Sequence, residues 1–184
     1  TKAGTPYGVF TPYKNAWLKK LTDFYLKAYP VAHHAAALAP LPDELDTGVP
    51  TLDDIDFEPT NLHTLRRPSG SAGAQELLAE FLDERIDRYD QTRDFPAVKG
   101  PSYLSTHLRF GTVSIRKLVA TALQATITGS AGAAVWLGEL IWREFYFQIL
   151  ANFPHVTQSA FKPQFDAIRW RHGKHAQQLF QAWC

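Results

Sequence analysis

Residues 136–146 hold the densest group of side chains that could do chemistry, in a stretch whose apolar residues recur at helical spacing. On a helix, one face would carry two indoles, a carboxylate, a guanidinium and a phenol: Trp136, Glu139, Trp142, Arg143 and Tyr146. Flat aromatic rings can stack on a planar ligand, a carboxylate can accept hydrogen bonds from its edge, and a guanidinium can hold an anion. One interpretation of this face is therefore the wall of a ligand cavity.

A plainer interpretation needs no ligand. Glu139 and Arg143 are four positions apart, so they could form an intrahelical ion pair that stabilises the helix by about 0.2–0.5 kcal/mol. The aromatic residues would then be ordinary core residues of a buried helix. The spacing alone leaves both interpretations open.

Residues 89–105 form a second candidate segment, in which a glycine turn at Gly100 precedes Ser102 and Ser105. Hydroxyls and unpaired backbone N–H groups at the start of a helix can cradle a phosphate. The same pattern opens any capped helix, which is its commoner meaning. Arg93, upstream of the turn, would by itself be read as a solvated surface arginine.

Composition limits the classes of function. The chain has 184 residues and a formal net charge of +1, which argues against a protein that coats nucleic acid by bulk charge. The single cysteine, Cys184, cannot form an internal disulfide, and the seven histidines match no familiar zinc spacing, so no metal site is expected. We find neither a secretory signal nor an apolar stretch long enough to span a bilayer, and expect a soluble intracellular protein.

The pattern along the chain predicts an all-α second half. A short strand end is expected at residues 8–11, and a helix over residues 15–29 that Pro30 ends. A proline-rich, acidic connector follows to about residue 70. Helices are then expected over residues 71–89, 103–110, 114–126, 133–152 and 174–183, with an irregular segment at 161–170. Because the chain lacks an initial Met and ends on an apolar residue and a thiol, we expect an internal piece of a longer protein.

Several of these segments together resemble the cryptochrome/DNA photolyase family, most closely its class I cyclobutane pyrimidine dimer photolyases. The resemblance runs in order through residues 89–105, 108–111, 114–116 and 136–146, and covers roughly residues 71–183. It implies the N-terminal part of the family's helical FAD-binding domain at 71–184, preceded by a helix and long interdomain connector at 14–70. Residues 1–13 would be the end of the family's N-terminal α/β antenna domain.

The resemblance also implies cofactor contacts. FAD, chiefly through its phosphates, would be bound by Tyr89 and by the segment made of Pro101, Ser102, Tyr103, Leu104 and Ser105, with Trp136 beside the flavin. The sequence departs from the family at Pro101, where a threonine is usual, so the cradle loses a hydroxyl and an N–H at that position. Gly138 and Thr106 are further departures, in place of the usual Asn and Pro.

For DNA, the resemblance implies that Arg93 contacts the backbone, Glu139 hydrogen-bonds the damaged pyrimidine pair and Trp142 stacks on it. Residues 143–146, including Arg143 and Tyr146, would line the same cavity. Glu139 and Trp142 would be the catalytic pair of an enzyme that splits the pyrimidine dimer by light-driven electron transfer from reduced FAD. The lesion must leave the helical stack for this chemistry, and an aromatic floor with a polar edge suits a flipped-out base.

Two alternatives remain: a cryptochrome-type blue-light receptor that binds FAD without repair, and a non-catalytic helical interaction module. Under the main interpretation the partner is UV-damaged DNA, the protein is a cytoplasmic, bacterial monomer without a protein partner, and a second antenna chromophore binds outside this chain. We also expect residues 1–184 alone to be inactive and to bind FAD weakly or not at all, because other segments of the family's flavin pocket are not in this chain.

Overall fold

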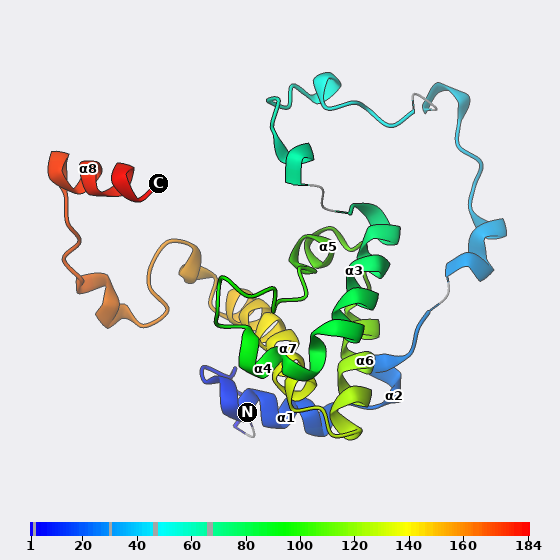
Figure 1. Ribbon diagram of the computed structural model, residues 1–184, viewed down its shortest axis with the longest axis horizontal. Helices are drawn as coiled ribbons and strands as arrows, with labels where there is room; N and C mark the ends of the chain where they lie inside the picture. The colour runs from blue at the N-terminus through cyan, green and yellow to red at the C-terminus, as the bar shows by residue number, and fades with distance from the viewer. Residues whose placement is uncertain (2, 30, 46–47, 66–67) are drawn as a thin grey trace. The chain divides into compact units, whose positions relative to one another are not determined.

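A computed structural model describes residues 1, 3–29, 31–45, 48–65 and 68–184. Within these ranges the chain forms helices and turns and contains no β-strand, as the predicted all-α class requires (Figure 1). The α-helices are α1 (Phe10–Lys20), α2 (Asp23–Leu26), α3 (Gly70–Glu84), α4 (Tyr89–Thr92), α5 (Ser105–Phe110), α6 (Ile115–Ile127), α7 (Ala131–Asn152) and α8 (Gly173–Trp183). Short 3₁₀ turns separate several of them: η1 (Val31–Ala37), η2 (Asp43–Leu45), η3 (Asp53–Ile55), η4 (Leu62–Leu65), η5 (Ile86–Arg88), η6 (Pro154–Thr157) and η7 (Pro163–Ala167).

The N-terminal segment differs from the prediction in two ways. Phe10 opens helix α1, so the expected strand end at residues 8–11 is wrong; Pro12 is tolerated there because it lies in the first helical turn, where its missing N–H has no partner to lose. The single helix expected over residues 15–29 is also interrupted. Thr22 adopts an extended backbone at φ −133° and ψ 170°, and α2 begins at Asp23, as suits residues that favour helix starts over interiors. Pro30 lies outside the described residues.

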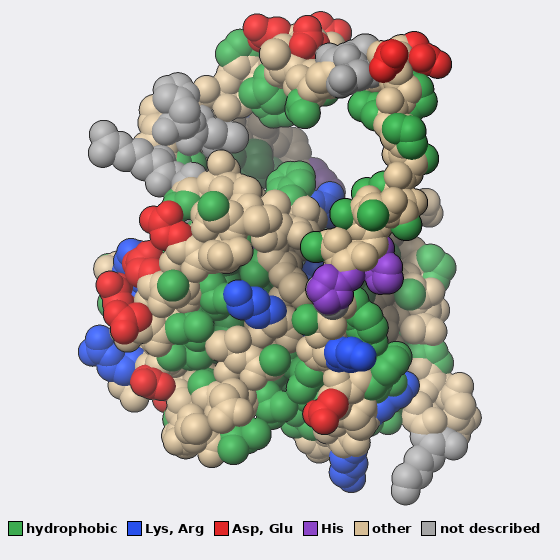
Figure 2. All heavy atoms as spheres, turned by 90° about the vertical axis from the view of Figure 1, so that its right-hand side faces the viewer, with side chains coloured by type: hydrophobic (Ala, Val, Ile, Leu, Met, Phe, Trp, Pro, Cys, Tyr) green, Lys and Arg blue, Asp and Glu red, His purple; other side chains and the backbone are tan. Residues whose placement is uncertain are grey.

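The proline-rich stretch between α2 and α3 carries only the short turns η1 to η4. Its described residues from Val31 to Leu45 and from Gly48 to Thr60 are exposed. Figure 2 shows acidic side chains grouped at the top of one face, where this stretch runs. Residues 46–47 and 66–67 of the predicted connector lie outside the described ranges. Proline at this density prevents longer helices, which explains why only short turns form here; the connector role of this stretch stays a prediction.

The chain divides into two compact units, residues 17–140 and residues 1–16 with 141–184. In the first unit, α3, α5, α6 and the start of α7 bury a core that includes Phe81, Leu104, Leu118 and Trp136. Gly132 permits a close approach: a Cβ built there would lie 2.0 Å from the carbonyl oxygen of Ile86. The predicted helix over residues 71–89 is shorter than expected, because Arg85 leaves helical geometry at φ −130° and the 3₁₀ turn η5 follows.

The other predicted helices are confirmed with small shifts. Ser114 precedes α6, and Gly111 ends α5 in the left-handed region at φ 68°, a conformation that glycine adopts without steric cost. In the second unit, the end of α7 packs with the start of α1, and Phe145 and Ile149 are buried there. Helix α8 carries Phe180 and Trp183 with 62% and 81% of their surfaces exposed.

Candidate functional site

Along residues 136–146 of helix α7, the aliphatic side chains are buried and the side chains expected to face a ligand contact solvent, with one exception. The cavity-wall interpretation requires this arrangement. Leu140, Ile141 and Phe145 are at most 6% exposed, and core contacts account for them. The residues expected to face a ligand retain solvent contact: Glu139, Trp142 and Arg143 are half-buried, and Tyr146 is 62% exposed. The exception is Trp136, which is 3% exposed and packs at 4.8 Å and 56° against Phe81.

Glu139 has a partner that its helix spacing does not predict. The Arg93 guanidinium, from the segment just after α4, donates a short hydrogen bond from Nη1 to Oε1 of Glu139. Both side chains are partly exposed, at 29% and 35%. This hydrogen bond is the largest cause of the raised pKa of Arg93, so its positive charge is secure. Two residues expected to act separately, one on the DNA backbone and one on the lesion, therefore form an ion pair.

The plainer interpretation of α7, a Glu139–Arg143 pair along the helix, is not what the structure shows. Glu139 pairs with Arg93, and the Arg143 guanidinium carbon lies 4.6 Å from the centroid of the Phe147 ring. Arg143 thus makes a cation–π contact on the partly exposed side of α7. Each of the two charges has its own partner, which argues against a mere helix-stabilising pair.

Tyr89, expected at the cofactor, lies at the start of α4 and is 8% exposed. Its ring meets Phe81 edge-on at 5.9 Å, and the guanidinium of Arg93 lies 5.5 Å from its centroid. Burial raises the pKa of the Tyr89 hydroxyl above its ordinary value. A neutral phenol next to a paired guanidinium can donate one hydrogen bond to an anion.

Residues 100–105 form the expected turn into a helix. Gly100 is required at its start, since a Cβ there would lie 2.8 Å from the backbone of Thr92. Tyr103 adopts a left-handed backbone at φ 58°, which is uncommon for a residue with a side chain and costs about 1–2 kcal/mol. Pro101 and Ser102 are half-buried, Leu104 is 1% exposed, and Ser105 is exposed as the first residue of α5.

The serine hydroxyls of this turn do not cap α5. Leu104 occupies the N-cap position without a side-chain hydrogen bond, and its N–H points to the Ser102 hydroxyl at 3.5 Å. The capping interpretation of the two serines is therefore wrong. Ser105 keeps an exposed hydroxyl and the turn stores backbone strain, which is common where a ligand is held.

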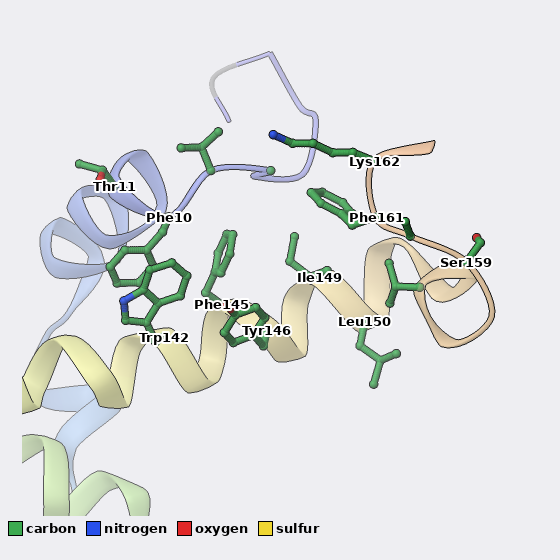
Figure 3. Close-up of a pocket in the computed structure, with 14 residues that line it drawn as sticks. Phe10, Thr11, Trp142, Phe145, Tyr146, Ile149, Leu150, Ser159, Phe161 and Lys162 are labelled. Atoms are coloured by element: carbon green, nitrogen blue, oxygen red, sulfur yellow. The ribbon is translucent and has the colours of Figure 1, made fainter. Parts of the chain in front are cut away.

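The second unit carries the aromatic cluster around Trp142. The Phe10 ring lies over the Trp142 indole with 3.6 Å between centroids and 7° between planes (Figure 3). Phe145 meets both rings edge-on, at 5.7 Å from Phe10 and 5.5 Å from Trp142. Tyr146 lies 5.5 Å from the indole at 23°. Phe10 is the residue that sequence reasoning missed, because no motif spacing relates it to α7.

A groove of about 790 Å³ runs beside these rings. Its lining is largely apolar and comes from α7, from the start of α1 with the two residues before it, and from η6 with the segment after it. The lining residues are Gly8, Val9, Phe10, Thr11, Trp142, Phe145, Tyr146, Ile149, Leu150, Val156, Ser159, Ala160, Phe161 and Lys162 (Figure 3). Trp142 thus borders an open groove rather than a closed core. Among the described residues, no group of three or more His, Cys, Asp or Glu side chains is placed to hold a metal ion. No helix in those ranges has the length and apolar character needed to cross a bilayer.

Comparison with known proteins agrees with these features. A family model described as "FAD binding domain of DNA photolyase" matches residues 136–184. The deoxyribodipyrimidine photo-lyase of Vibrio cholerae is 37% identical over all of this chain and 38% of its own length. The protein of that name from Escherichia coli is 34% identical over 90% of this chain and 34% of its own length.

A solved structure agrees with the fold. A bacterial class III photolyase from Agrobacterium tumefaciens superimposes with a TM-score of 0.79 and 28% identity, over 100% of this chain and 37% of its own. The chain thus spans less than two fifths of the relatives that it matches. The family model, the two relatives and the solved structure agree, and the chain is similar along its length to DNA photolyases.

Proposed function

We propose that this chain forms part of a deoxyribodipyrimidine photolyase, which repairs UV-induced cyclobutane pyrimidine dimers in DNA with light and reduced FAD. The observation that carries the proposal is helix α7, in which Glu139, Trp142, Arg143 and Tyr146 retain solvent contact. Leu140, Ile141 and Phe145 of the same helix are buried. The relatives that match along the whole chain bear this enzyme's name.

Glu139 is the proposed contact to the edge of the flipped-out pyrimidines. A carboxylate offers about four lone-pair sites on two oxygens, and Arg93 uses Oε1. Acceptor capacity therefore remains for N–H groups on the base edge. The guanidinium also neutralises the carboxylate, which lowers the repulsion that a DNA phosphate would meet on approach.

Arg93 is the proposed contact to the DNA backbone. It can donate five hydrogen bonds, and its Nη1 bond to Glu139 and a 3.3 Å contact from Nε to Asp94 leave donors for a phosphate. One side chain would then join the backbone contact to the lesion contact. A phosphate contact positions the DNA, whereas the contact to the bases selects the damaged site.

Trp142 is the proposed stacking surface for the lesion, with Tyr146 and Arg143 along the same helix. Stacking a base on an aromatic side chain contributes about 1–3 kcal/mol. Extruding a base costs a few kcal/mol, and the cost is lowest for a damaged pair. The stacking energy is therefore of the size needed to prefer a dimer over normal DNA.

The residues expected at FAD fit such a group in part. The strained turn at Tyr103, the exposed hydroxyl of Ser105 and the neutral phenol of Tyr89 are suited to a diphosphate. Bound FAD supplies the electron and the light absorption for the reaction. Ser102, Leu104 and the backbone at Pro101 would shape the turn. Trp136 is buried, so it would support the flavin-facing side of α7 from within the core rather than face solvent.

The proposal also includes UV-damaged DNA as partner, action as a cytoplasmic bacterial monomer, and an antenna chromophore bound outside these residues. Residues 1–13 are assigned to the end of an antenna domain, 14–70 to a helix and connector, and 71–184 to the start of the FAD-binding domain. The groove beside Trp142 speaks against the interaction-module alternative, in which the aromatic helix is plain core.

The experiment is a repair assay on the full-length gene product, with an oligonucleotide that contains one cyclobutane thymine dimer. Blue light should restore the intact thymines, and Trp142→Ala should reduce repair and the preference for damaged DNA. Trp170→Ala, at a 71% exposed tryptophan, is the matched control and should repair normally. Flavin binding without repair would instead favour the cryptochrome-type receptor.

A further inference from the structure

Two hydrogen bonds, one on each side of Phe10 in the sequence, hold the N-terminal segment against helix α7. The Gln148 side chain donates a 2.9 Å hydrogen bond from Nε2 to the carbonyl oxygen of Tyr7. The Tyr13 hydroxyl hydrogen-bonds the carboxylate of Glu144, and burial together with this carboxylate raises the Tyr13 pKa to about 12. Because Glu144 and Gln148 are one helical turn apart, the segment lies along α7 with its ends fixed.

Phe10 lies between these two hydrogen bonds, which limit its movement away from helix α7. Its ring covers one face of the Trp142 indole almost in parallel, at 3.6 Å and 7°. Buried Phe145, 6% exposed, closes the cluster by meeting both rings edge-on. The indole plane is thus set by two neighbours rather than by the Trp142 rotamer alone (Figure 3).

Tyr146 is the neighbour that can move. Its ring is 62% exposed and lies 5.5 Å from the indole at 23°, so it overlaps Trp142 less closely than Phe10 does. Turning it into solvent breaks no buried contact of comparable closeness. A planar ligand that reaches Trp142 therefore gains room by moving Tyr146 while Phe10 stays.

We propose that Phe10 is a positioning residue for DNA repair: stacked behind Trp142, it fixes the indole plane and leaves one face for the flipped-out pyrimidines. The proposal rests on the proposed function, in which Trp142 stacks on the lesion. It predicts that the ring of Phe10, and not merely its apolar volume, is needed for damage recognition. The opposite role, a plug that occupies the place of the lesion, predicts tighter binding when the ring is removed.

The test uses the full-length gene product and two oligonucleotides of one sequence, with and without a cyclobutane thymine dimer. The quantity measured is the ratio of the two dissociation constants. Phe10→Leu, which keeps apolar volume but loses the flat ring, should lower this preference roughly two- to tenfold, the size expected of an aromatic pair. Phe10→Tyr keeps the ring and should retain the preference. Phe165→Leu, at a ring that is 50% exposed and outside the groove lining, is the matched control and should retain the preference.

A second arm separates positioning from general destabilisation. In a Trp142→Ala background, Phe10→Leu should have no further effect on the preference, whereas a purely structural loss would act in both backgrounds. If Phe10→Leu does not fold, Phe10→Met replaces it with the same expectation. An unchanged preference in the folded variant, or a tighter complex with the dimer, would overturn the proposal for Phe10 alone. An unchanged preference in Trp142→Ala would overturn the stacking role proposed for Trp142 as well, whereas an absence of light-driven repair would overturn the proposed function.

Discussion

The ion pair between Arg93 and Glu139 provides the sharpest energetic prediction. Replacing Arg93 by Gln and Glu139 by Gln, singly and together, removes the charges while keeping polar side chains of similar length. Arg93→Gln also removes the cation–π contact with Tyr89, at 5.5 Å, so its single effect exceeds the pair's own contribution. The double-mutant cycle isolates the coupling between the two charges.

The structure sets the size of that coupling. Two unit charges 4 Å apart attract by about 4 kcal/mol at an effective dielectric constant of 20, before desolvation and side-chain entropy are subtracted. Fully exposed pairs retain about 0.2–1 kcal/mol, and hydrogen bonds to charged groups contribute about 1.5–3 kcal/mol. With side chains 29% and 35% exposed, Arg93 and Glu139 fall between these cases. We expect a coupling of roughly 1 kcal/mol in the free energy of unfolding, after this discount for solvent screening.

The assay is denaturant unfolding of the four proteins at low and high salt. The neighbouring pair of Arg93 with Asp94 gives a matched control, because Asp94 is 79% exposed and lies 3.3 Å from Nε. An Arg93→Gln and Asp94→Asn cycle should show a coupling below about 0.3 kcal/mol. If the coupling from the Glu139 cycle is no larger than that from the Asp94 cycle, the ion pair does not form in solution.

Three further predictions concern the folded state. Phe81→Ala, at a fully buried ring against Trp136, should destabilise the protein by about 3–5 kcal/mol, and a loss below 1 kcal/mol in denaturant unfolding would contradict the assigned core. Gly132→Ala places a methyl group 2.0 Å from a carbonyl oxygen of η5 and should cost about 1–3 kcal/mol despite alanine's better helix propensity, so a raised midpoint of thermal unfolding would refute this packing. Tyr13 keeps its proton in the folded state between its ordinary pKa of 10.0 and about 12, while the unfolded phenol loses it. Stability should therefore fall as pH rises through that window, and less steeply in Tyr13→Phe; equal slopes for both proteins would count against the Glu144 contact.

The helical class and the arrangement of side chains on helix α7 could be predicted because both depend on local periodicity. Leu140, Ile141 and Phe145 alternate with Glu139, Trp142 and Arg143 at helical spacing, and burial follows that spacing. Gly111 and Ser114 marked helix boundaries through backbone preferences of single residues. Such signals are contained within a few residues of sequence.

The partners of the charged and aromatic groups could not be predicted, since they come from distant segments. Arg93 and Glu139 are 46 positions apart, and nothing in either motif indicates the pair. Phe10 was expected in a strand end, and its stacking on Trp142 depends on a helix start that Pro12 tolerates. By its spacing, Trp136 was expected on the same helix face as Glu139 and Trp142, yet packing against Phe81 buries it. Tertiary contacts decided these three cases.

Repair of pyrimidine dimers with light is the activity that we propose for the full-length protein. The most direct measurement follows the loss of thymine dimers from a defined oligonucleotide incubated with the full-length gene product, in blue light and in darkness. We expect conversion to intact thymines only in the light, with multiple turnovers per protein. Dimer levels that stay equal in light and darkness, although the protein holds reduced FAD, would contradict this expectation.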